Sequence, residues 1–119
     1  MATNRITIMQ GATYKLRFTY RENGYQVVVP EGYDMIAGVY TPKGQLVMSA
    51  KISNGGIVQD PKAEEPIYIW QVTHAQSAAL SGAYILEVTV VDSNLTVVSH
   101  ATSLVTLDFV ERRNNSLLS

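Results

Sequence analysis

The residues best suited to chemistry are two histidines, His74 and His100, and an adjacent pair of carboxylates, Glu64 and Glu65. Zinc sites normally take three or four nitrogen, sulfur or oxygen ligands, and neither histidine has a second histidine or a carboxylate at ligand spacing. The carboxylate pair stands in a polar, proline-bounded stretch typical of an exposed loop, whereas paired acid and base work needs a cleft. The sequence therefore predicts no metal site, no cofactor and no enzymatic activity.

Asp92, Ser93 and Asn94 offer oxygens at alternate positions, as a calcium-binding loop does. The glycine and the distal glutamate of such a loop are missing, and Asp and Asn are favoured in turns because they bond their own backbone. A hairpin turn is therefore preferred here. The sequence also contains no GxSxG, no HExxH and no glycine-rich phosphate loop.

A basic segment opens the chain, because its first 21 residues carry four cations and no acid. In an alternating strand Lys15 and Arg17 share the solvent face, so Lys15, Arg17 and Arg21 form a candidate strip for an acidic partner surface or phosphate. The plainer and preferred interpretation is a solvated strand face. A pI of 6.1 makes nucleic acid an unexpected partner.

Short segments of alternating or β-branched character, separated by turn residues, fill most of the chain. They predict strands at 5–10, 13–20, 25–29, 34–40, 45–52, 67–72, 83–91, 95–100 and 101–110. Their spacing of roughly ten residues is typical of an antiparallel β-sandwich. One short helix is expected near residues 74–80, because Thr73 and Gln76 have the spacing of a capping box and Gly82 supplies a stop.

Composition bounds the organisation of the chain. Its 119 residues are 46% apolar and 16% charged, with a net charge of −1, which predicts one globular domain at 1–110 followed by a polar tail at 111–119. No cysteine is present, which excludes disulfides and thiolate ligands. No stretch approaches the roughly 20 apolar residues that span a bilayer, and no signal-type run opens the chain, so a cytoplasmic product without membrane contact is expected.

The longest alternating strand, with Tyr84, Leu86, Val88 and Val90 on one face, begins just after Gly82. This Gly-Ala-Tyr order resembles the tyrosine corner of immunoglobulin-like sandwiches, with Leu86 where antibody domains carry a cystine half. The resemblance implies a structural corner formed by Gly82 and Tyr84.

The resemblance extends over nearly the whole chain. Together with Gln10-Gly11-Ala12-Thr13-Tyr14, Lys43-Gly44 and Thr73 to Leu80, the corner is similar to the immunoglobulin-like N-terminal domain of phage baseplate upper proteins and to related phage tail and capsid accessory proteins. The resemblance implies an immunoglobulin-like antiparallel sandwich of about 7–9 strands. It also implies a non-enzymatic virion protein, made in the host cytoplasm, that docks in many copies on other virion structural proteins and takes no small-molecule substrate. A carbohydrate- or receptor-binding module that uses exposed tyrosines is the alternative.

Overall fold

The structure, a computed structural model, describes residues 4–100 and 105–111. The predicted tail at 111–119 lies outside this part of the chain, apart from Glu111. The described elements, in chain order, are β1 (Asn4–Met9), β2 (Tyr14–Phe18), β3 (Tyr20–Glu22), β4 (Tyr25–Val27), β5 (Asp34–Tyr40), β6 (Leu46–Lys51), β7 (Ile57–Gln59), β8 (Tyr68–Val72), α1 (His74–Ala78), β9 (Gly82–Val91), β10 (Val97–His100) and β11 (Val105–Val110).

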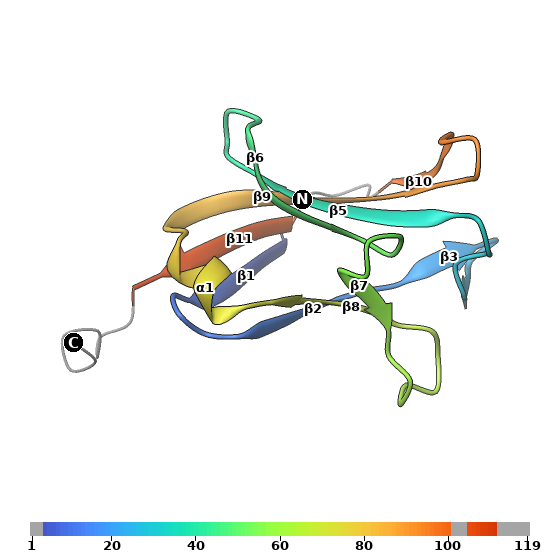
Figure 1. Cartoon of the computed structure of the whole chain (residues 1–119), viewed down its shortest axis with the longest axis horizontal. Coiled ribbons are helices and arrows are strands. Elements are labelled where there is room, and N and C mark those ends of the chain that lie inside the picture. The colour runs from blue at the N-terminus through green and yellow to red at the C-terminus, as the bar shows by residue number, and fades with distance from the viewer. Residues whose placement is uncertain (1–3, 101–104, 112–119) are drawn as a thin grey trace.

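Two sheets face each other across the core (Figure 1). The larger has the order β1-β11-β9-β5-β6, with β10 also paired to β9, and the smaller has the order β2-β8-β7. In the immunoglobulin convention the order β11-β9-β5-β6 corresponds to strands G-F-C-C′, and β2-β8-β7 corresponds to B-E-D. The fold is therefore an immunoglobulin-like β-sandwich with one short helix, as the sequence predicts.

Strand direction is one point on which the prediction of an antiparallel sandwich is incomplete. β1 runs parallel to β11, with Ile6 beside Leu107 and Ile8 beside Phe109, whereas the other pairs are antiparallel. Alternation shows which side chains share a face but carries no information on the direction of the neighbouring strand. The described strands also outnumber the 7–9 expected, because the segment 13–20 divides into β2 and β3 and the short β7 is added.

The core forms where the inward faces of the two sheets meet. The alternation predicted for β9 holds as far as Val90, since Leu86 and Val90 are buried, but Val91 on the opposite face is buried as well. Leu86 lies between Val39 of β5 and Val105 of β11. From the other sheet, Leu16 and Trp70 are almost completely buried. Burying a side chain of this size contributes roughly 1.5–3 kcal/mol, so these faces fix which sides of β2 and β8 remain exposed.

The local signals between β8 and β9 act as predicted. The Thr73 hydroxyl accepts from the Gln76 amide at 3.2 Å, and the Gln76 side chain accepts from the Thr73 amide at 3.0 Å, which completes a capping box. α1 nevertheless stops at Ala78, two residues before the predicted end. The buried Ser77 hydroxyl donates to the Ala12 carbonyl at 2.7 Å and so ties the helix to the turn before β2.

The β3–β4 hairpin turns at Asn23 and Gly24, which both have positive φ, the conformation that an Asn-Gly pair favours in two-residue hairpin turns. Its third cross-strand pair joins Tyr20 to Val27. The hairpin belongs to neither of the two facing sheets, so its residues do not lie on the same face as those of β2.

Candidate interaction surface

The outward side of β2 carries two of the three predicted basic residues. Leu16 points into the core, so Lys15 and Arg17 on either side of it are exposed on the outer face of the three-stranded sheet. On the neighbouring strand β8, Gln71 lies opposite Lys15 and Ile69 lies opposite Arg17.

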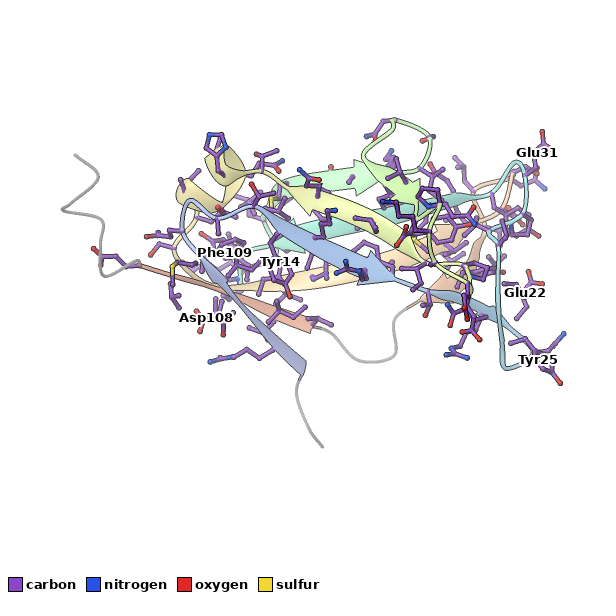
Figure 2. All side chains as sticks on the ribbon, turned by 90° about the horizontal axis from the view of Figure 1, so that it is seen from below. Tyr14, Glu22, Tyr25, Glu31, Asp108 and Phe109 are labelled. Atoms are coloured by element: carbon purple, nitrogen blue, oxygen red, sulfur yellow. The ribbon has the colours of Figure 1, made fainter. Side chains whose placement is uncertain are left out.

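This outer surface continues to the edge of the sheet, where Val58 of β7 pairs with Ile69 and is 55% exposed. We call the five residues Lys15, Arg17, Val58, Ile69 and Gln71 the basic face. Figure 2 looks onto this sheet from below. Within the described residues, neither cation of the basic face forms an ion pair or a side-chain hydrogen bond. Two uncompensated charges therefore lie on β2, and the apolar residues Ile69 and Val58 extend across the sheet from Arg17.

Arg21, the third predicted basic residue, is separated from the other two. It lies on β3 in the two-stranded hairpin, where its guanidinium donates to the Gly24 carbonyl at 3.3 Å. The structure thus brings Lys15 and Arg17 onto one face and places Arg21 in another element.

A groove of about 750 Å³ is lined by residues of β6, β7 and β8 and includes every residue of the basic face except Arg17. Trp70 and Val58 contribute apolar surface to it, and Lys15, Lys62 and Asp60 contribute the charges. Among its lining residues the cations therefore outnumber the carboxylate. Its size allows a protruding apolar side chain to enter.

A second group of exposed residues lies at one end of the sandwich, the end that holds both the β3–β4 hairpin and the turn between β9 and β10 (Figure 1). Tyr25 is 74% exposed on the hairpin, and Figure 2 shows it at the same end as Glu22 and Glu31. The buried Tyr20 hydroxyl donates to Glu22 at 2.8 Å, and burial together with this bond raises the pKa of Tyr20 to about 12. The bond fixes Glu22 on the hairpin.

The predicted corner at Gly82 and Tyr84 is only partly present. Gly82 has a φ of +86°, as a tight glycine corner requires, and it begins β9. The half-buried Tyr84 ring packs edge-on against Phe109, with ring centroids 5.6 Å apart. No hydrogen bond joins its hydroxyl to the backbone of the described residues, so the bond that defines a tyrosine corner is not formed there. Tyr84 contributes packing instead, because it lies inside the sheet opposite Leu107.

The residues considered for other chemistry remain apart. His74 is exposed at the start of α1, and Glu64 and Glu65 are exposed between β7 and β8. Asp92 accepts backbone bonds within its own turn. Residues 4–100 and 105–111 contain no cluster of three side chains able to hold a metal ion. In the same ranges, no helix has the length and apolar character needed to cross a bilayer.

Comparison with known proteins finds similarity in structure only. The sequence matches no protein-family model and no curated protein. A single-mutant thermostable endoglucanase from Alicyclobacillus acidocaldarius aligns with 13% identity and a TM-score of 0.48 over 92% of this chain, which spans 14% of the endoglucanase chain. The fibronectin(III)-like modules of Clostridium thermocellum CbhA align with 10% identity and a TM-score of 0.43, over 95% of this chain and 94% of theirs. A chain from the crystal structure of the ZIG-8–RIG-5 IG1–IG1 heterodimer aligns with 14% identity and a TM-score of 0.43, over 92% of this chain and 84% of that chain.

Proposed function

We propose that this protein is a non-enzymatic structural component of a phage virion, an accessory capsid or tail and baseplate protein that docks in many copies on neighbouring virion proteins. The observation that carries the proposal is the basic face, where Lys15 and Arg17 lack carboxylate partners among the described residues and share an outer sheet surface with the exposed Val58 two strands away. Charged groups without partners beside exposed apolar surface are typical of a surface that a complementary protein covers. The resemblance of the sequence to phage accessory domains supplies the kind of assembly.

The backbone of the basic face is prearranged for docking. Its residues lie on three hydrogen-bonded strands whose other faces are held in the core by Leu16, Trp70 and Ile57. Docking on such a sheet orders few backbone torsions, so less of the interaction free energy is lost to conformational entropy. The long Lys15 and Arg17 side chains remain the main groups to be ordered on binding.

The virion role is tested on particles purified from a culture that encodes this chain. Quantitative mass spectrometry of gradient-purified particles should find it in many copies per particle, whereas an abundant host protein should fall to background through the same gradient. Difference density in electron microscopy, between particles with and without the protein, would then locate it. Absence of the chain from purified particles would refute the proposed function.

The docking face is tested by a charge reversal with a matched control. The double variant Lys15→Glu/Arg17→Glu should fold normally but lose incorporation into particles by at least about tenfold, the scale of one strong interface residue. The control Lys43→Glu/Lys51→Glu changes the same charge on exposed residues of the β5–β6 turn and β6. Equal incorporation of the two double variants would show that the basic face is not the docking surface.

A carbohydrate- or receptor-binding module is the alternative, and Tyr25 is the observation that favours it. Its ring is 74% exposed on the β3–β4 hairpin, where it could stack on a sugar, while the other six tyrosines are buried or half-buried. A glycan array should then give a signal that Tyr25→Ala removes. An empty array would count against this alternative.

A further inference from the structure

The turn between β9 and β10 displays a leucine in a backbone conformation that leucine rarely adopts. Leu95 has a φ of +63°, and its side chain is 78% exposed. The Asp92 amide donates to the Thr96 carbonyl at 2.9 Å, and the Leu95 amide donates to the Asp92 carbonyl at 3.0 Å. In hairpin turns with three loop residues, the residue with positive φ is usually glycine. A bulky side chain there is strained.

The rest of the turn supports this conformation. The Asp92 carboxylate accepts from the amide of Asn94 at 2.9 Å and from that of Thr96 at 3.0 Å. Leu95 itself contributes little to the core, because most of its side chain faces solvent. Glycine or asparagine would adopt the same backbone with less strain. The leucine side chain is therefore explained by a contact outside the folded chain.

The surroundings of Leu95 define the chemistry of that contact. Val28, Val97, Val98 and Tyr25 are also exposed at this end of the sandwich. A Cβ on Gly32 would lie 3.8 Å from the Ser93 side chain, so the segment after β4 touches the turn that carries Leu95.

The charges of this end are mainly negative. Within residues 20–33 and 92–98 the sequence has three carboxylates, Glu22, Glu31 and Asp92, and one cation, Arg21. We call these two segments the acidic tip. The tip joins an apolar centre to an acidic rim, which disfavours an anionic membrane surface as its partner.

We propose that the acidic tip of one copy docks on the basic face of a second copy, with Leu95 entering the groove beside Val58. The proposal rests on the proposed function only in taking the basic face as an interface. Lys15 and Arg17 would meet the carboxylates of the tip, and Val58 and Ile69 would meet its apolar side chains. The two surfaces thus carry opposite charge, and each has exposed apolar side chains that the other can cover.

The contact joins two different patches, so every copy offers one tip and one face. Such a heterologous contact builds a ring when the rotation between copies closes, and an open chain when it does not. It therefore provides the many copies that a virion component needs.

Sedimentation velocity over a concentration series at low salt tests the contact. The wild-type protein should form larger species as its concentration rises, and Leu95→Asn should weaken this association by about tenfold or more, as expected for a central apolar contact. Asparagine tolerates positive φ, so the melting temperature should stay equal or rise. The matched control Leu46→Asn changes a leucine that is 51% exposed and lies directly after the turn between β5 and β6. This variant should associate like wild type.

A mixing experiment tests the polarity of the contact. Leu95→Asn keeps an intact face, and Lys15→Gln/Arg17→Gln keeps an intact tip, so neither should associate alone but their mixture should form a 1:1 complex that does not grow. A wild-type protein that is monomeric up to about millimolar concentration, the weak end of protein affinity, would overturn the proposal. So would a Leu95→Asn protein that associates normally, or a mixture without the complex. If the chain is present in particles but monomeric in solution, the virion role survives and the proposed contact fails. If it associates in solution but is absent from particles, the proposed contact survives and the virion role fails.

Discussion

Two turns of the six-stranded sheet share one hydrogen-bond pattern but differ at the residue with positive φ. In the turn at 41–45, between β5 and β6, the Thr41 amide donates to the Gln45 carbonyl and the Gly44 amide donates to the Thr41 carbonyl, both at 2.8 Å. The turn at 92–96 has the same two bonds, at 2.9 and 3.0 Å. Gly44 has a φ of +92°, and Leu95, at the equivalent position, has a φ of +63°.

The two turns lie at opposite ends of the sheet (Figure 1). In both, a side chain of the first residue supports the last, since the Thr41 hydroxyl accepts from the Gln45 amide and the Asp92 carboxylate accepts from the Thr96 amide. Backbone geometry alone therefore accounts for Gly44 but not for Leu95. The difference indicates that the 41–45 turn only connects strands, whereas the 92–96 turn also presents a side chain.

Removing the carboxylate of the strained turn should have the largest effect on stability. Asp92→Ala deletes two hydrogen bonds to a charged acceptor, and we expect the free energy of unfolding to fall by about 2 kcal/mol. Thr41→Ala deletes one bond to a hydroxyl in the relaxed turn and should cost about 0.5–1 kcal/mol. Urea unfolding of the two variants measures the difference. A loss in Asp92→Ala no larger than that in Thr41→Ala would mean that the carboxylate does not hold the strained turn.

Much of the fold follows from patterns that the sequence states locally. Alternation identifies the inward side of β9, the Asn23-Gly24 pair locates a hairpin, and Thr73 with Gln76 starts α1. The parallel pairing of β1 with β11 could not be predicted in this way, because it joins segments about 100 residues apart. Alternation also does not show whether neighbouring strands run parallel or antiparallel.

The interaction surfaces were predicted less completely. Lys15 and Arg17 were expected to share an exposed face, and they do, since alternation around Leu16 is enough to place them. The same pattern predicts Arg21 beside them, which is wrong, because Arg21 lies on β3 of the separate two-stranded hairpin. The sequence predicts a strand from Leu95, because an apolar residue there continues the pattern towards Val97, but β10 begins only at Val97. The type of a residue does not determine its φ. The sequence signal that could have identified Leu95 is an apolar residue at the position of a three-residue turn where glycine is usual.

Making the relaxed turn resemble the strained one should have the next largest effect. Gly44→Leu introduces a bulky side chain at a φ of +92°, and we expect a loss of about 1–2 kcal/mol in the free energy of unfolding. A Cβ at position 44 meets no described atom within 4 Å, so the loss would come from the backbone conformation and not from a clash. Gly44→Asn is the control and should lose less, because asparagine tolerates this region. If both variants were as stable as wild type, positive φ would carry no strain in either turn.

The reverse change should have the smallest effect on stability and the clearest effect on association. Leu95→Gly relieves a strain of roughly 1–2 kcal/mol in the folded protein. It also raises the conformational entropy of the unfolded chain, which lowers the free energy of unfolding by about 0.4–1 kcal/mol. We therefore expect a net gain of about 0.5 kcal/mol in the free energy of unfolding, measured by urea denaturation together with sedimentation of the same sample. A folded, slightly more stable protein that no longer associates would show that the leucine is kept for contact. A protein that loses stability would instead show that the Leu95 side chain supports the fold, and the contrast between the two turns would then lie inside the domain.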